Sequence, residues 1–282
     1  MKNTGLVLEG GGMRGLYTAG ALECFMQKDI FFPYVIGVSA GACMAASYLS
    51  RQVGRNKVVN IDYAKQPDYI SIRNLIRKRE IFGMDYLFDE IPNIHVPYDY
   101  DSFFENNEEF MIGTTNCETG EPEYFGKEQY KQKDMLKILR ASSSLPLIAP
   151  VIPYQGMQLL DGGISDPIPL LKSEEDGNEK HVIILTKNRN YIKSKSKFIW
   201  YLEKKYPQYP NLIRVLANRH HIYNERINYI YEQERLGNVF VISPSLPIKV
   251  GRIERNPKKL MELYELGYRD ADEQLERLMD WV

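Results

Sequence analysis

Ser39 stands at the centre of Gly37-Val38-Ser39-Ala40-Gly41, which matches the pattern Gly-x-Ser-x-Gly. The apolar residues before it predict a buried strand, and the small residues from 40 to 49 predict a tightly packed helix. A serine on such a sharp turn is presented to a substrate, the flanking glycines remove Cβ atoms that would clash, and the helix N-terminus favours negative charge. The pattern therefore predicts Ser39 as the nucleophile of an acyl transfer, with a tight turn and a buried serine as the alternative.

A glycine-rich loop, Gly10-Gly11-Gly12-Met13-Arg14-Gly15, follows a short apolar run at 5–8 and precedes a helical pattern over about 16–27. The same spacing occurs in dinucleotide-binding proteins, so a nucleotide-binding module is one interpretation. That interpretation requires an acidic residue at the end of the second strand, about 20 residues on. Here the second strand ends at Gly37-Val38-Ser39, which disfavours it.

The alternative use of this loop is an oxyanion hole, in which backbone N–H groups bind the oxygen that becomes negative when an acyl carbonyl is attacked. The N–H groups of Gly11, Gly12 and Met13 would face that oxygen, and the Ala40 N–H would be the natural second donor. Arg14 has two interpretations of equal standing. It either holds the loop and adds positive charge, or faces solvent at the start of the helix.

Asp161 follows the short apolar strand 158–160 and precedes Gly162 and Gly163, which allow a sharp turn. It is the best candidate for the base that takes the Ser39 proton. A free aspartate has a pKa of about 3.9, so burial or a hydrogen bond to Ser39 must compensate for its weak basicity. The alternative is an aspartate that stabilises a turn. Asp166 is a rival, but it precedes a proline, which suits a loop role.

A conventional triad would add a histidine, and His181, His220 and His221 follow Asp161 in the chain. None has a motif around it, so a catalytic role for any of them is the weaker hypothesis. The histidines show no metal-ligand spacing. The three cysteines (Cys24, Cys43 and Cys117) are widely spaced. We therefore expect no metal site, no disulfide framework and a reducing compartment.

The glycine-rich loop, the Ser39 pattern and Asp161-Gly162-Gly163, in that order, resemble the patatin-like phospholipase family in its bacterial form. The resemblance covers about residues 4–170 and includes the stretch 140–146 (Arg-Ala-Ser-Ser-Ser-Leu-Pro). It implies a Ser39–Asp161 dyad without histidine, the 10–15 loop as oxyanion hole, and hydrolysis of acyl esters of phospholipids or neutral lipids without a cofactor. Asp166 departs from the family, where an amide residue is expected. The region after about 170 carries no transferable signature.

Strands and helices alternate along the chain, which predicts an α/β fold with a mostly parallel central sheet and helices on both faces, in three layers. Further strands are expected at 110–115, 123–125, 182–185 and 239–242, and a helix at about 130–139. The last 25 residues predict one helix capped by Asn256 and Pro257. The stretch 53–104 indicates only short helices. We expect a single domain over 1–282, completed by a helical part from about 190.

Composition narrows the partners. Lys and Arg total 36 against 37 Asp and Glu, for a formal charge of -1, which argues against nucleic acid as the main partner. No segment approaches the roughly 18 apolar residues that span a bilayer. We expect a cytoplasmic protein that acts on a lipid or fatty acyl ester, with any membrane contact peripheral and at the inner face. A non-catalytic lipid-binding regulator is a further alternative.

The stretch 193–205 combines lysines with Phe198, Trp200 and Leu202. Basic residues around an aromatic run suit a protein that settles on an anionic membrane surface. The favoured alternative is an ordinary helix that keeps its lysines in water and buries the three apolar side chains in part.

Overall fold

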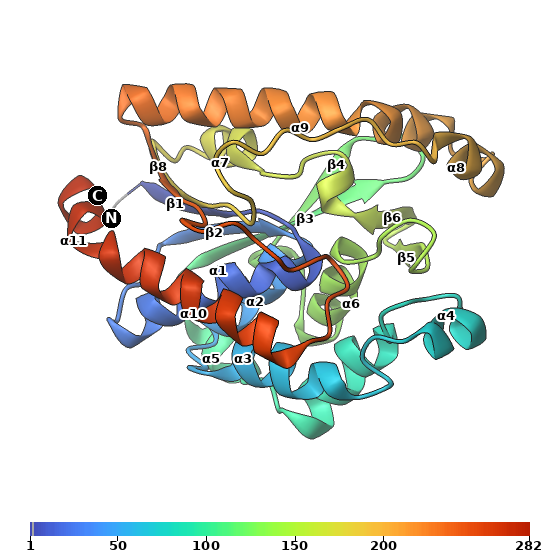
Figure 1. Cartoon of the computed structure of the whole chain (residues 1–282), viewed down its shortest axis with the longest axis horizontal. Helices are drawn as coiled ribbons and strands as arrows, with labels where there is room; N and C mark the ends of the chain where they lie inside the picture. The colour runs from blue at the N-terminus through green and yellow to red at the C-terminus, as the bar shows by residue number, and fades with distance from the viewer. Residues whose placement is uncertain (2) are drawn as a thin grey trace.

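A mixed, mostly parallel sheet forms the centre of the structure, a computed structural model that describes Met1 and residues 3–282 (Figure 1). The strand order is β5-β6-β3-β2-β1-β7-β8, and β4 pairs with β3 outside this path. β1, β2, β3, β7 and β8 are parallel, whereas β4, β5 and β6 add antiparallel pairs around β3. The strands are β1 (Thr4–Leu8), β2 (Tyr34–Val38), β3 (Glu109–Asn116), β4 (Pro122–Gly126), β5 (Ile152–Tyr154), β6 (Met157–Asp161), β7 (Lys180–Ile184) and β8 (Val239–Ile242).

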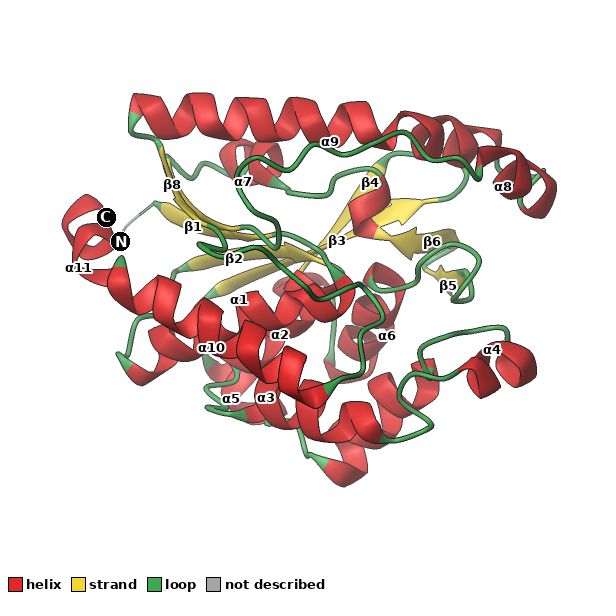
Figure 2. Ribbon diagram, in the orientation of Figure 1, coloured by secondary structure: helices red, strands yellow, loops and turns green. Residues whose placement is uncertain are grey.

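Helices cover both faces of this sheet, which confirms the predicted α/β fold (Figure 2). In the view shown, α7 and α9 lie above the sheet and α1, α2, α6 and α10 lie below it. The helices are α1 (Gly15–Gln27), α2 (Ala40–Leu49), α3 (Arg55–Lys57), α4 (Ile72–Lys78), α5 (Tyr100–Glu105), α6 (Gln132–Ser142), α7 (Leu170–Glu175), α8 (Ile199–Lys205), α9 (Pro210–Leu236), α10 (Pro257–Glu273) and α11 (Leu275–Trp281).

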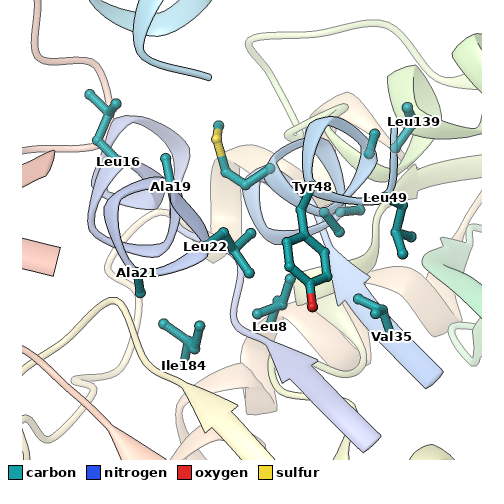
Figure 3. Packing of buried hydrophobic residues seen from close by; sticks show 14 of the residues in the cluster. Leu8, Leu16, Ala19, Ala21, Leu22, Val35, Tyr48, Leu49, Leu139 and Ile184 are labelled. Atoms are coloured by element: carbon teal, nitrogen blue, oxygen red, sulfur yellow. The ribbon is translucent and has the colours of Figure 1, made fainter. Parts of the chain in front are cut away.

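The strands β1, β2 and β8 are almost entirely apolar because both of their faces are buried. In β1, Leu6 and Leu8 join the hydrophobic cluster beneath the sheet, whereas Val7 joins the cluster under α9. This alternation follows from the period of two along a strand. Figure 3 shows the lower cluster, where side chains of α1 and α2 pack over Leu8, Val35 and Ile184.

The C-terminal helix α10 packs directly on α1, the helix that follows the glycine-rich loop (Figure 1). Glycine makes this approach possible: a Cβ atom at Gly20 would lie 1.9 Å from the Tyr264 carbonyl oxygen, and one at Gly267 would lie 2.0 Å from that of Tyr17. The Tyr17 hydroxyl also donates a 2.9 Å hydrogen bond to Asp270 on α10. The end of the chain thereby supports the element that carries the loop.

The predicted single C-terminal helix is wrong in one respect, because it breaks into α10 and α11 at Gln274. The Gln274 side chain donates to the Asp270 carbonyl at 2.8 Å, at the end of α10. The chain then turns so that Trp281 packs against Phe240 of β8 and donates to the Gly237 carbonyl. Contacts with the sheet edge thus override the continuous helical pattern.

The stretch 53–104 forms α3, α4, α5 and two π-helical segments, Val58–Asp62 and Tyr86–His95, the second containing Pro92. No helix in the described part of the chain is long and apolar enough to cross a membrane. The 193–205 stretch differs from the favoured expectation. Leu202 is buried, but Phe198 and Trp200 are 66% and 58% exposed.

Candidate active site

Ser39 lies between β2 and α2 with a backbone φ of 54° and ψ of -128°. A non-glycine residue in this region costs roughly 1–3 kcal/mol, so the surroundings must enforce it. The two flanking glycines allow the chain to close around the turn. A Cβ at Gly41 would lie 2.6 Å from the Leu8 carbonyl oxygen, and one at Gly37 would lie 2.8 Å from the Ala42 nitrogen.

Ser142 holds this turn in place from the end of α6. Its Oγ accepts a 2.8 Å hydrogen bond from the Ser39 N–H and donates a 2.6 Å bond to the Gly113 carbonyl of β3. Two residues later, the Ser144 carbonyl accepts a 2.8 Å hydrogen bond from the Asp161 N–H. The 140–146 stretch therefore positions both members of the predicted dyad, a role that its sequence did not indicate.

Asp161 ends β6 and is only 2% exposed. Its Oδ1 accepts a 2.9 Å hydrogen bond from the Gly163 N–H, whereas Oδ2 has no hydrogen-bond partner among the described residues. Burial raises the pKa of Asp161, and the positive charge of Arg219 and the Ser39 side chain oppose that rise. The raised pKa makes this carboxylate a better base than a free aspartate.

The glycine-rich loop lies against the serine. A Cβ atom at Gly10 would lie 3.1 Å from the Ser39 Cβ, and Gly12 adopts a φ of +58°. The Met13 N–H donates to the Arg252 carbonyl at 3.0 Å, so this amide is already engaged and leaves the predicted donor set. The amides of Gly10–Gly12, and that of Ala40 at the start of α2, make no backbone hydrogen bond within the described residues. An oxyanion hole requires unengaged N–H groups of this kind beside the nucleophile.

A model of the patatin-like phospholipase family matches residues 6–172, which is more than half of the chain. The chain belongs to the patatin-like phospholipase family. A second model, of a domain of unknown function (DUF6363), matches residues 209–282. The first match covers the elbow, the loop and Asp161 together, as the sequence resemblance predicted.

An uncharacterized protein of Escherichia coli, YjjU, is 29% identical over 186 residues, which cover 64% of this chain and 51% of that protein. The lysophospholipase NTE1 of Candida albicans is 23% identical over 299 residues, covering 95% of this chain and 20% of that protein. The chain thus spans about half of the first relative and a fifth of the second. The crystal structure of VipD from Legionella pneumophila aligns over 97% of this chain and 67% of that chain, with 15% identity and a TM-score of 0.49.

Asp166, the rival candidate for the base, contacts residues that lie outside the pockets at Ser39. Its carboxylate accepts a 2.7 Å hydrogen bond from the Tyr124 hydroxyl and lies 3.6 Å from the Arg226 guanidinium. The residue is 5% exposed and lines neither of the pockets at Ser39. We assign it a structural role between β4 and α9.

The three histidines considered for a triad also lie outside the pockets at Ser39. His181 is buried at the start of β7, where its Nδ1 lies 3.0 Å from the Ser173 Oγ, and burial lowers its pKa to about 4. His220 and His221 are on α9, and neither pocket at Ser39 is lined by histidine in the described part of the chain. The described residues contain no cluster of three or more His, Cys, Asp or Glu that suits a metal.

Two pockets meet at Ser39 and Gly12. The larger one has a volume of about 130 Å³ and a mostly apolar wall. Its wall comes largely from α2, α6 and the 53–104 stretch, whose sequence showed no clear pattern. Apolar residues in this wall include Met44, Ala46, Val59, Phe82, Leu87, Phe88, Ile91, Met135 and Leu139.

The smaller pocket is lined by Ser39, Asp161 and Arg14 and has a more polar wall than the larger one. Arg14 is 9% exposed, which contradicts the solvent-facing interpretation of this residue. Its Nε has no hydrogen-bond partner among the described residues. Arg14 therefore adds positive charge beside the loop instead of capping a surface helix.

Proposed function

We propose that this chain hydrolyses carboxylic esters of lipids, with Ser39 as nucleophile and Asp161 as base. The observation that carries the proposal is the position of Ser39. It lines an apolar pocket, beside a buried carboxylate and next to four unengaged backbone N–H groups. The membership in the patatin-like family and the similarity to a protein named lysophospholipase support a lipid substrate.

In the first step, the Ser39 Oγ attacks the ester carbonyl carbon, and Asp161 Oδ2 takes the hydroxyl proton. The carbonyl oxygen becomes negative and accepts hydrogen bonds from the Gly10–Gly12 and Ala40 amides. One such donor is worth about 3–4 kcal/mol of transition-state stabilisation. The C–O bond to the alcohol then breaks, the alcohol leaves with the proton from Asp161, and an acyl-Ser39 ester remains.

In the second step, water attacks the acyl-Ser39 carbonyl while Asp161 accepts a proton from it. The same amides stabilise the second oxyanion, and its collapse returns the proton to the Ser39 Oγ and releases the fatty acid. Asp161 acts as a base in both attacks and as an acid in both collapses. A histidine is not required, because the unpartnered Oδ2 is available for the proton.

The apolar pocket suits the acyl chain. Each methylene that it removes from water contributes about 0.8 kcal/mol. Methionines in the wall, such as Met44 and Met135, adapt to chains of different shape. Cys43 also lines the pocket, but burial raises its pKa to about 11, so it stays a thiol and does not compete with Ser39.

Peripheral membrane contact forms part of the proposal. Ile72 and Ile76 on α4 are 72% and 76% exposed, and Phe198 and Trp200 at α8 are also exposed. Lysines and arginines accompany both groups in the sequence. Such a combination suits binding to an anionic lipid surface, from which the substrate would enter the apolar pocket.

Hydrolysis of p-nitrophenyl butyrate, octanoate and palmitate by the wild type, Ser39→Ala and Asp161→Asn tests the proposal. We expect both variants to lose at least about 10³-fold in kcat, since each removes a group used in every step. Two matched controls are Ser50→Ala, another buried serine of the α2 region, and Asp166→Asn, another buried aspartate. These should retain activity in their folded fraction.

Activity that survives Ser39→Ala would overturn the proposal. A nucleotide-binding module would instead bind NAD or ATP with Ser39 dispensable. A non-catalytic lipid-binding regulator would bind fatty acid equally well in wild type and Ser39→Ala, without releasing product from any ester.

A further inference from the structure

The polar pocket beside Ser39 gathers five basic side chains. Two carboxylates, Glu9 and Asp161, lie among them, so positive charge is in clear excess. Glu9 is itself engaged, because its carboxylate accepts hydrogen bonds from the Thr186 N–H and the Tyr223 hydroxyl. The basic residues are Arg14, Lys187, Lys193, Arg219 and Arg252.

None of these five cations forms an ion pair in the described part of the chain, where all ion pairs involve other residues. Arg14 is more than nine-tenths buried, and its Nε lacks a hydrogen-bond partner among the described residues. Burying a guanidinium without an ion-pair partner is costly, and an anion bound beside it offsets that cost. The charges of this pocket therefore favour the binding of an anion.

The cations also repel one another. Burial, followed by the charges of Arg219 and Arg252, lowers the pKa of Lys193 to about 7. Burial and Arg252 lower the pKa of Arg219 to about 10. Like charges held this close in a partly desolvated site occur where function uses them, because folding alone does not favour them.

Most of this charge comes from the part of the chain that carries no patatin signature. Only Arg14 lies within residues 6–172, whereas Arg219 and Arg252 lie within residues 209–282, the match to a domain of unknown function. Both residues are tied to the catalytic elements. The Arg219 Nε donates a 2.6 Å hydrogen bond to the Gly163 carbonyl, and the Arg252 carbonyl accepts from the Met13 N–H.

We propose that Lys193, Arg219 and Arg252 bind a phosphate-type oxyanion in this pocket, so that the C-terminal region selects acyl esters whose alcohol part carries a phosphate. The inference rests on the proposed esterase function. With the acyl chain in the apolar pocket and the carbonyl at Ser39, the alcohol side of the ester faces the cations. In a glycerophospholipid the phosphate follows the ester within a few bonds. Guanidinium groups such as those of Arg219 and Arg252 match its oxygens in geometry and charge.

The C-terminal region therefore acts as the headgroup-recognition part of the enzyme. It supplies charge to a site whose nucleophile, base and oxyanion donors all lie before residue 162. Free inorganic phosphate has the same chemistry as the headgroup, so the test must separate the two.

The test compares hydrolysis of a lysophosphatidic acid and of a monoacylglycerol with the same acyl chain. The quantity measured is the ratio of kcat/KM for the phosphate ester to kcat/KM for the neutral ester. We expect this ratio to fall about 10–100-fold in Arg219→Gln, Arg252→Gln and Lys193→Met, because each variant loses a charged hydrogen bond. Lys258→Met, an exposed cation at the start of α10, is the control and should leave the ratio at its wild-type value. Calorimetric titration of inorganic phosphate into each protein completes the set.

A lower ratio together with weaker phosphate binding in the pocket variants supports the proposal. Weaker phosphate binding with an unchanged ratio shows a site for the free ion and overturns the substrate assignment. Wild-type binding and an unchanged ratio in all three variants overturn the pocket itself. Failure of the esterase function is distinguishable, because the wild type would then hydrolyse neither ester while the phosphate titration would still report on the pocket.

Discussion

Ser142→Ala removes the side chain that holds the turn at Ser39, and Ser142 itself lines neither pocket there. The Ser142 Oγ accepts from the Ser39 N–H and donates to the Gly113 carbonyl, and Ser142 is fully buried. The variant leaves two buried backbone groups without partners, each at a cost of about 1–3 kcal/mol. We therefore expect the free energy of unfolding to fall by about 2–6 kcal/mol.

The catalytic effect follows from the backbone of Ser39. Its φ of 54° is unfavourable by roughly 1–3 kcal/mol, so the turn relaxes when its restraint is lost. A displacement of about 1 Å at the reacting atom costs about 10²-fold in rate. We expect kcat to fall by about that factor, with KM for the acyl chain nearly unchanged because the apolar pocket is intact.

The assay combines thermal unfolding with steady-state hydrolysis of p-nitrophenyl octanoate at a temperature where the variant is folded. Ser50→Ala is the matched control, because Ser50 is also buried and makes hydrogen bonds of 3.2 and 2.9 Å to Ser47 and Gln52, at the opposite end of α2 from Ser39. A Ser142→Ala protein that loses no more stability than Ser50→Ala and keeps the full wild-type kcat would refute the reasoning.

Three further predictions follow from the pockets and the surface. Val59→Trp should narrow the apolar pocket and exclude about four methylenes of a long acyl chain. At about 0.8 kcal/mol for each methylene, kcat/KM for palmitate should fall about 10²-fold more than kcat/KM for butyrate. Equal losses for the two esters would count against the assigned acyl site. Because the pKa of Lys193 is about 7 and its cationic form binds anions, affinity for inorganic sulfate should be highest below pH 7 and fall about tenfold by pH 8. Lys193→Met should flatten that profile, and a wild-type slope in the variant would contradict the assignment. Trp200→Ala should reduce the fraction of protein that sediments with anionic vesicles, whereas Trp281→Phe, at the sheet edge, should not. Equal binding by the wild type and both variants would exclude α8 from the membrane contact.

The fold could largely be predicted from local patterns. Apolar runs such as 5–8 and 182–185 fall on β1 and β7, and the helical pattern after Gly15 is α1. These elements are determined by near neighbours, because burial on both faces requires an uninterrupted apolar strand. The break at Gln274 could not be predicted, since it depends on contacts of Trp281 with β8.

The candidate site divides in a similar way. Ser39, Asp161 and the Gly10–Gly15 loop carry short patterns, and the structure brings them together, although their catalytic roles stay predictions. The engagement of the Met13 amide by Arg252 could not be predicted. Its partner is more than 200 residues away in the chain, as the residue numbers show. Asp166 likewise needed the structure to show its contact with Arg226.

The sequence by itself determined which residues could perform ester chemistry, because a nucleophile elbow, an oxyanion loop and an aspartate turn each require particular residue types at adjacent positions. Only the tertiary structure decided what surrounds them. The apolar pocket and the cationic pocket draw single side chains from elements far apart in the chain, such as Met135 on α6 and Arg219 on α9. No local pattern marks such residues, since their meeting depends on how α9 and α10 pack onto the sheet and α1.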